Sequence, residues 1–215
     1  MITDIDLLIF DLDGTLVDTR EDLANAVNHA LRHLGIATLP TDDVMNFVGN
    51  GLKKLMERSL GTQLQEKLPQ AIALFQDYYR DHLIDNSVLY PGVREVLEHY
   101  RNKKKAVISN KPEAFTIAMI EQLNLSPHFQ LILGGDTVAE MKPSPVPVQH
   151  VLGELGVPPR RGVMVGDGTT DIESGRAAGI QTCAVTYGYR SSEVLSAVEP
   201  DHLLSGITDL LRYYK

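Results

Sequence analysis

The sequence predicts an α/β fold, with a Rossmann-like parallel-sheet core and an inserted helical cap domain. Short apolar runs without polar alternation, helical patterns between most of these runs, and one long stretch without a convincing strand lead to this prediction. The chain has 215 residues, which suits one domain with a modest insert or two small domains.

The apolar runs are predicted to be strands covered on both faces, because buried parallel strands do not alternate apolar and polar residues. They lie at 7–10, 106–108, 131–133, 162–165 and 183–185. Helical patterns lie between most of these runs, at 93–100, 114–123, 146–155 and 171–178. Alternation of strands and helices indicates a parallel sheet with right-handed crossovers. The run of lysines at 103–105 is predicted to be a solvated turn before the second core strand.

The stretch 16–89 is predicted to be the helical cap domain. Its first helix is indicated by apolar residues at helical spacing, namely Leu23, Val27, Ala30, Leu31 and Leu34, and by Gly35 as a stop signal. Further helices are predicted at 41–47, 52–60 and 63–82. Tyr90-Pro91-Gly92 marks the return to the core. We therefore expect a core domain of residues 1–15 and 90–215, with the cap at 16–89.

The charge balance bears on the partners of the protein. The formal net charge is -8, and nucleic acids and anionic membranes require basic surfaces, so we expect neither as a partner. Cys183 is the single cysteine, so an internal disulfide is impossible, and its apolar surroundings predict a buried side chain. The first residues carry acids instead of the basic flank of a signal peptide. We expect a cytoplasmic protein that is a monomer or a weak homodimer.

Polar residues that follow the predicted strands are the candidates for a functional site. The carboxyl ends of parallel strands meet at one edge of the sheet, and ligands bind there. The candidates are Asp11, Asp13, Ser109, Asn110, Asp167 and Asp171, with Lys142 in a polar loop. Each short pattern alone is typical of a solvated loop or turn. If these residues were only parts of polar loops, we would not expect all of the patterns to follow apolar strands in one order.

Such a collection of carboxylates requires a cation. Ligands that are all oxygen, without histidine or cysteine, indicate Mg²⁺ rather than zinc. Mg²⁺ and Lys142 would offset the repulsion between an attacking carboxylate and a phosphate dianion. The hydroxyl of Ser109 can hold a phosphate oxygen. These residues predict phosphoryl transfer from a small phosphorylated metabolite.

The complete set of motifs resembles the haloacid dehalogenase superfamily over nearly the whole chain. The resemblance rests on Phe10 to Leu16, Ser109 to Pro112, Lys142-Pro143 and the pair Asp167 and Asp171. It implies that Asp11 is a nucleophile that forms an aspartyl-phosphate and that Asp13 is the general acid and base. It further implies that Ser109 binds phosphate, that Lys142 neutralises charge, and that Asp11, Asp13, Asp167 and Asp171 hold Mg²⁺, Asp13 through its backbone carbonyl.

Within this superfamily the chain most resembles the phosphoglycolate phosphatases, which implies 2-phosphoglycolate as substrate. The likeness lies in the segments 18–23, 48–52, 109–112 and 186–189. The substrate-binding residues expected from it are Ser109, Asn110, Lys111, Gly49, Asn50, Gly51 and Lys53. Glycines allow the loop at 49–51 to approach a ligand closely, and Lys53 or Lys54 adds positive charge for a carboxylate. A cap hinge with two solvated lysines is the competing interpretation.

Alternative activities remain open. A phosphatase for another small phosphate ester or for pyrophosphate, or a phosphotransferase similar to phosphoglucomutases, would share the same apparatus. Such mutases tend to carry a histidine shortly after the Asp-Thr pair, whereas this chain has none until His29. Dehalogenases and phosphonatases usually lack the second aspartate, which is present here as Asp13. The chain departs from the family at Gly168, where serine, threonine or asparagine is common.

Overall fold

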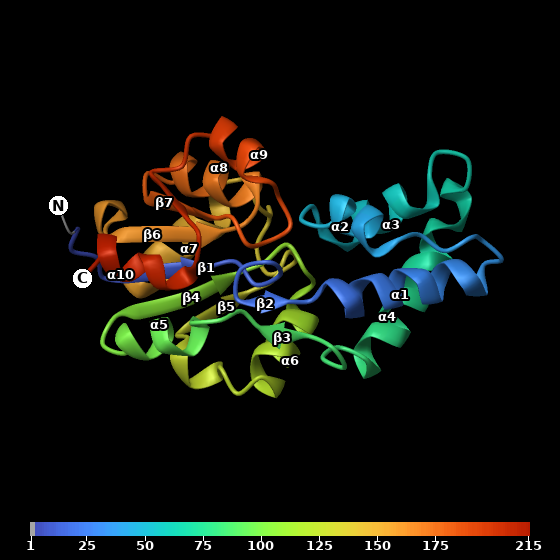
Figure 1. Cartoon of the computed structure of the whole chain (residues 1–215), viewed down its shortest axis with the longest axis horizontal. Helices are drawn as coiled ribbons and strands as arrows, with labels where there is room; N and C mark the ends of the chain where they lie inside the picture. The colour runs from blue at the N-terminus through green and yellow to red at the C-terminus, as the bar shows by residue number, and fades with distance from the viewer. Residues whose placement is uncertain (1–2) are drawn as a thin grey trace.

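The computed structural model describes residues 3–215, and within that range a six-stranded parallel sheet forms one part of the molecule. A group of helices forms the other part, beyond one end of the sheet (Figure 1). In spatial order the strands are β5 (Leu131–Leu133), β4 (Lys104–Ile108), β1 (Leu7–Phe10), β6 (Gly162–Gly166), β7 (Gln181–Val185) and β8 (His202–Leu204). The α/β class with a Rossmann-like core is thus confirmed.

The strand order places a topological switch point beside β1. From β1 the core continues to β4 and β5 on one side, and then returns to β6 on the other side of β1. The carboxyl ends of β1 and β6 are therefore neighbours, while the connections that follow them turn to opposite sides. Ligand sites form at such crevices in open α/β sheets.

Helices cover both faces of the sheet. Side chains of β1 alternate between the faces, because successive residues of a strand point in opposite directions. Leu8 and Phe10 join the cluster that includes residues of α5 and α6, whereas Leu7 and Ile9 join the cluster with α7. The helices of this part are α5 (Val93–His99), α6 (Glu113–Gln122), α7 (Val146–Leu155), α8 (Thr169–Ala177), α9 (Ser192–Ala197) and α10 (Leu210–Tyr213).

Four further helices of the described chain lie between β1 and β4 in sequence and form the second part of the molecule (Figure 1). They are α1 (Arg20–His33), α2 (Thr41–Phe47), α3 (Gly51–Leu60) and α4 (Leu68–Asp81). Each of the longer helices is amphipathic and buries its apolar face against the others, with α1 packed on α4. Asp22 of α1 is buried and accepts hydrogen bonds from Asn86 and Ser87 after α4.

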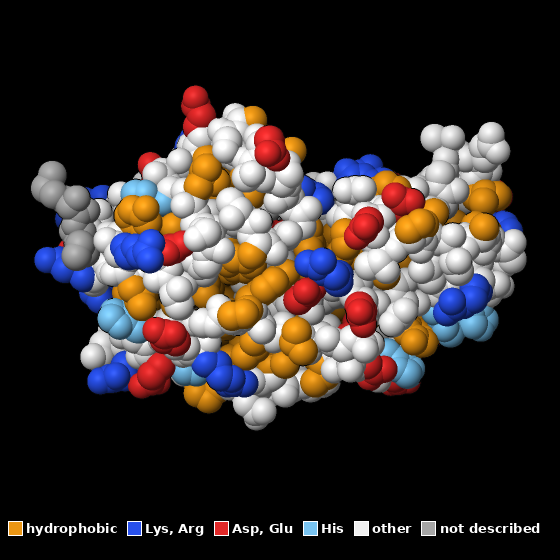
Figure 2. Space-filling model, in the orientation of Figure 1, with side chains coloured by type: hydrophobic (Ala, Val, Ile, Leu, Met, Phe, Trp, Pro, Cys, Tyr) orange, Lys and Arg blue, Asp and Glu red, His pale blue; other side chains and the backbone are white. Residues whose placement is uncertain are grey.

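Two short strands that the sequence analysis did not predict lie at the junction of the two parts. β2 (Val17–Asp18) and β3 (Val88–Leu89) pair antiparallel there. Such two-residue strands carry too little periodicity to be recognised from sequence. Figure 2 shows hydrophobic side chains gathered in the middle of this face, over the β2–β3 region, where Val88 is exposed.

The prediction of a solvated turn at 103–105 was wrong for Lys104 and Lys105, whereas Lys103 does lie in the turn before β4. Lys104 and Lys105 begin β4, and Lys105 is buried. Its Nζ donates to the carbonyl oxygens of Tyr100, at 2.6 Å, and Lys103, at 2.9 Å. The carbonyl of Tyr100 ends α5, so a helix end supplies the acceptor that makes this burial tolerable. Cys183 is buried in β7, as predicted.

Among residues 3–215, no helix combines the length and the apolar character that crossing a membrane requires.

Candidate active site

The loop after β1 carries the first two candidate residues. Asp11 extends the sheet by one more bond, since its N–H donates to the carbonyl of Val165 at 2.9 Å. Gly14 has φ = 85° and packs against Asp167, and a Cβ there would lie 2.3 Å from the Asp167 Oδ2. Only glycine satisfies both conditions. This close approach brings the loop of Asp11 and Asp13 against the end of β6.

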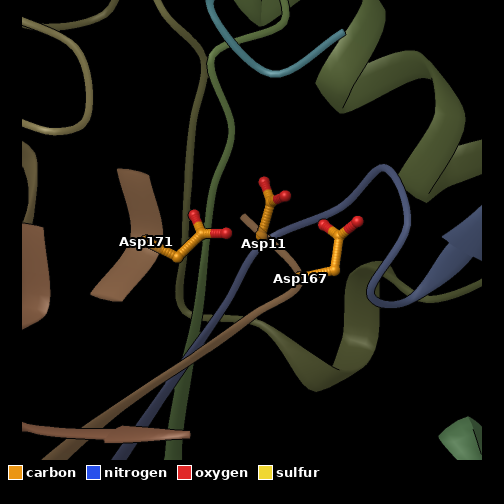
Figure 3. Close-up of side chains that lie close together, drawn as sticks. All are labelled: Asp11, Asp167 and Asp171. Atoms are coloured by element: carbon orange, nitrogen blue, oxygen red, sulfur yellow. The ribbon is translucent and has the colours of Figure 1, made fainter. Parts of the chain in front are cut away.

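Asp11, Asp167 and Asp171 lie together at the carboxyl edge of the sheet. One carboxylate oxygen of each residue lies within 4.8 Å of those of the other two. Figure 3 shows the three carboxylates pointing to the same side, from the end of β1, the loop after β6 and the start of α8. The sequence prediction named these three residues as metal ligands, and the structure brings them together.

Lys142 is the cation inside this cluster. Its Nζ lies 2.8 Å from the Asp11 Oδ1 and 2.6 Å from the Asp171 Oδ1, and it also donates to the carbonyl of Ile108. Burial alone would lower the pKa of Lys142, but the carboxylates of Asp11 and Asp171 outweigh it and raise the pKa. Lys142 therefore remains charged at neutral pH. It comes from the loop before α7, as its position in the sequence predicted.

One ammonium does not balance the carboxylates. Burial raises the pKa of Asp11 well above its ordinary value, with Lys142 opposing the shift and Asp171 and Asp167 adding to it. Burial and the charge of Asp171 likewise raise the pKa of Asp167 to about 7. Carboxyl groups in this condition take up a proton unless a cation replaces it. The all-oxygen donor set and the excess negative charge fit Mg²⁺, so the residues present suit that metal.

Asp13 is held by side chains from two segments. Its Oδ1 accepts from the Lys111 Nζ at 2.6 Å and from the Thr19 Oγ1 at 2.7 Å. Lys111 also donates to the hydroxyl of Tyr79 on α4, at 2.9 Å, and Thr19 contacts the hydroxyl of Tyr189. Because both donors bond to Oδ1, Oδ2 is the oxygen left for a substrate or a proton.

Ser109 and Asn110 follow β4 and face the same space. The Ser109 Oγ accepts from the backbone N–H of Lys111 at 3.2 Å. The Asn110 Nδ2 donates to the carbonyls of Gly49, at 2.9 Å, and Lys142, at 2.8 Å. Its Oδ1 is buried and has no partner among the described residues. Asn110 thus connects the loop before α3 with the loop that carries Lys142.

A cavity of about 70 Å³ opens between the sheet edge and the helices α1, α3 and α4. This volume corresponds to a few water molecules and suits a small ligand. All the catalytic candidates line it, together with Asn110, Lys111, Gly49 and Gly51. Asn50 and Lys53 do not. The side chain of Lys53 is 74% exposed and lies 3.8 Å from Glu57, because it occupies the outer face of α3.

Tyr79 and Arg190 are two of the cavity-lining residues that sequence reasoning missed. Tyr79 lies inside an ordinary amphipathic helix, where an aromatic residue indicates packing, so the sequence contains no signal for its hydrogen bond to Lys111. Arg190 lies in the loop after β7, five positions beyond the strand. A search extended from the strand ends to whole loops at the carboxyl edge would have found it.

This fold and this arrangement of aspartates and lysine define a hydrolase of a known class. A model of the haloacid dehalogenase-like hydrolase family matches residues 8–185, and the chain belongs to this family. The match covers β1 through β7 and therefore every residue of the carboxylate cluster.

Similar proteins and solved structures show which kind of hydrolase within this family the chain is. The chain is 38% identical to a phosphoglycolate phosphatase of Chromobacterium violaceum, over 97% of each chain. It is 37% identical to one of Aquifex aeolicus, over 96% of this chain and 95% of the other. A crystal structure of a predicted phosphoglycolate phosphatase from Haemophilus somnus superposes with a TM-score of 0.92 at 30% identity, over 97% of each chain. The chain is accordingly a phosphatase of this family, a phosphoric monoester hydrolase.

Proposed function

We propose that this phosphatase hydrolyses 2-phosphoglycolate, depends on Mg²⁺, and forms an aspartyl-phosphate on Asp11. The observation that carries the proposal is the juxtaposition, at one small cavity, of Asp11 with Lys142 and of Asp13 with Lys111. The first pair supplies a nucleophile beside a cation, and the second supplies an acid and base whose orientation is fixed.

The reaction has two steps. An oxygen of Asp11 attacks phosphorus, and the bond from phosphorus to the glycolate oxygen breaks as Asp13 gives that oxygen a proton from Oδ2. Asp13, now ionised, takes a proton from a water molecule that attacks the phosphorus of the aspartyl-phosphate. The bond from phosphorus to the Asp11 oxygen breaks, inorganic phosphate leaves, and both Asp11 and Asp13 return to their initial states. Lys142 and the hydroxyl of Ser109 would hold oxygens of the transferred phosphoryl group.

The metal would be held by Asp11, Asp167 and Asp171 with the backbone carbonyl of Asp13. When bound, Mg²⁺ supplies positive charge that lets an anionic nucleophile meet an anionic phosphate. Backbone N–H groups around the site hold two of these carboxylates in place. Asp167 accepts from the backbone N–H of Tyr189 at 2.6 Å, and Asp171 accepts from the N–H of Gly168 at 2.9 Å. Gly168, where the family often has a polar side chain, thus contributes through its backbone.

The substrate's carboxylate would bind to Lys111. This lysine lines the cavity, its side chain is 5% exposed, and its ammonium donates to Asp13 and Tyr79, which leaves a third N–H for the substrate's carboxylate. Lys53 points away from the cavity, so we assign the role to Lys111 in its place. Residues 16–89 would act as the cap domain over this site, since Gly49, Gly51 and Tyr79 form the wall opposite Ser109.

Hydrolysis is favoured over phosphoryl transfer to a second sugar. Leu23, at the start of α1, lines the cavity, whereas His29, the first histidine of the chain, lies about 1.7 turns further along α1 and is absent from its lining. No histidine is among the residues around the cavity, so a histidine base for an incoming hydroxyl is missing from this part of the described chain.

The test is kcat/KM for 2-phosphoglycolate with Mg²⁺, measured beside sugar phosphates, nucleotides and pyrophosphate. A clear preference for 2-phosphoglycolate is expected. Activity on other esters but not on 2-phosphoglycolate would leave the phosphatase activity established and would exclude the proposed substrate. Phosphate release that ceases on addition of EDTA and returns with Mg²⁺ would support the metal.

A further inference from the structure

Arg190 joins the core to the helical part of the molecule. It lies in the loop after β7, and its guanidinium donates to the carbonyls of Met45, at 3.1 Å, and Val48. Met45 belongs to the last turn of α2, and Val48 is the residue that ends this helix. The last carbonyls of a helix have no partner within it, and a cation beside them is stabilising. The last turn of α2 contains no basic residue, so the core supplies one.

The base of this contact is fixed. Tyr189, the preceding residue, donates its N–H to Asp167 at 2.6 Å, and its hydroxyl accepts from the N–H of Thr19 at 2.8 Å. Ser191, the following residue, caps α9. Arg190 therefore extends from a loop that is attached to the carboxylate cluster on one side and to a helix start on the other.

The far end of the contact is a wall of the cavity. Val48, Gly49 and Gly51 line the cavity from the loop between α2 and α3. Arg190 holds the carbonyl of Val48, and Asn110 holds the next carbonyl, that of Gly49. Gly49 adopts φ = 108°, which few other residues tolerate, and thereby lets consecutive carbonyls meet two donors of the core.

A ligand larger than the cavity requires this wall to move outward. Outward movement separates Val48 and Met45 from Arg190, so the guanidinium and the Val48 carbonyl lose this hydrogen bond, whereas the Met45 carbonyl keeps the N–H of Val48. A small ester requires less of this movement than a bulky one. We propose that Arg190 is a specificity-determining residue that holds the wall at 48–51 in place and so favours small phosphate esters over bulky ones. The proposal rests on the proposed phosphatase function of this cavity.

A matched control is available in Arg58. This arginine lies on α3 and donates to the carbonyl of Phe47 at 3.0 Å, so it serves the same end of α2. Both Arg58 and its acceptor belong to the helical part of the molecule, and Arg58 is absent from the cavity lining. If an arginine only stabilises the end of α2, replacing either arginine should have the same effect on selectivity. If the connection to the core matters, only replacement of Arg190 should change selectivity.

The experiment compares Arg190→Ala, Arg190→Lys and Arg58→Ala with the wild type, using 2-phosphoglycolate and glucose 6-phosphate as small and bulky esters. In Arg190→Ala, we expect the ratio of kcat/KM values, small over bulky, to fall at least about tenfold, the scale of one hydrogen bond to a charged group. Arg190→Lys should recover part of the ratio, and Arg58→Ala should retain it. Amide hydrogen exchange at 48–52 should be faster in Arg190→Ala than in Arg190→Lys.

Two outcomes would overturn the proposal. The first is an unchanged ratio in an Arg190→Ala protein whose thermal unfolding shows an intact fold. The second is an equal change of the ratio in Arg58→Ala. A wild type that cleaves neither ester would instead remove the proposed function, and the selectivity with it, so the two failures are distinguishable.

Discussion

At the scale of single residues, the electrostatics of Asp11 and its neighbours separate the proposed roles. Asp11 contacts Lys142 and lies within the carboxylate cluster, whereas Asp13 contacts Lys111 and Thr19 outside it. The two aspartates are separated by one residue, so their side chains would leave an extended strand on the same side. Different partners nevertheless give them different chemistry.

Asp11→Asn removes the proposed nucleophile while keeping the volume of the side chain. We expect kcat to fall by at least about a thousandfold, because an amide oxygen does not form the covalent intermediate. The fold should persist, since Lys142 retains Asp171 and loses only one of two carboxylate partners. Phosphate release and thermal unfolding measure the two effects. A variant with substantial turnover would exclude the aspartyl-phosphate at this position.

Lys111→Met tests the contact with the substrate's carboxylate and keeps the aliphatic stem of the side chain. The KM for 2-phosphoglycolate should rise about 10- to 100-fold, the value of a charged hydrogen bond. The KM for phenyl phosphate, which lacks a carboxylate, should change less. A fall of kcat on both substrates is expected as well, because Asp13 loses a donor. Lys53→Met is the matched control, and its exposed side chain predicts unchanged values. Equal rises of KM on both substrates would remove this role.

At the scale of elements, the cores of strands and helices were predictable and their short connections were not. Runs such as Leu7 to Phe10 lack alternation because both faces of the strand are covered, and this pattern is visible in sequence. β8 escaped prediction because its three residues contain one exposed and one half-buried side chain. The return of the chain after α4 depends on Asp22, which lies far from its partners in sequence. No local sequence pattern predicts such a contact.

Asp22→Asn should loosen the attachment of α1 to the segment after α4. The carboxylate is buried and accepts from the backbone N–H groups of Asn86, at 3.0 Å, and Ser87, at 2.8 Å, as well as from the Ser87 hydroxyl. An amide at this position turns an NH₂ group toward one of these donors. We expect the free energy of unfolding to fall by about 2 kcal/mol or more. Urea denaturation measures it.

Glu21→Gln is the control for this variant, since Glu21 is the exposed neighbour on the same helix turn. Its effect should stay within about 0.5 kcal/mol. Equal stabilities of the two variants would show that the buried contact of Asp22 contributes nothing beyond an exposed charge.

At the scale of the whole molecule, the site is assembled from segments that only the fold brings together. Asp11, Lys142 and Asp171 are far apart in sequence, yet the parallel topology sends their loops to one edge. That convergence was predictable, because it follows from strand order alone. The wall of the cavity was predictable in part. Gly49 and Gly51 were expected there, whereas the side of α3 on which Lys53 points and the partners of Arg190 depend on how the helices pack.

Metal binding and folding are coupled through the carboxylate cluster. Asp167 ionises near its ordinary value of 3.8 in the unfolded chain and at about 7 in the metal-free fold. Between these values the folded state binds more protons than the unfolded state. The contribution of Asp167 to stability is therefore complete below pH 3.8 and is lost as the pH rises through about 7. The raised pKa of Asp11 acts in the same direction.

Mg²⁺ competes with these protons, so its stabilising effect should depend on pH. The increase of Tm on addition of a fixed Mg²⁺ concentration should be larger at pH 8 than at pH 6, because at pH 6 the ion must displace a proton from Asp167. Asp167→Asn removes this titrating group and a ligand together, so it should reduce both the Mg²⁺ effect and the loss of metal-free stability between pH 5 and pH 8. Differential scanning fluorimetry of both EDTA-treated proteins at pH 5, 6 and 8, with and without added Mg²⁺, measures these effects. An equal or larger Mg²⁺ effect at pH 6 would contradict the proton competition and would place the metal away from Asp167.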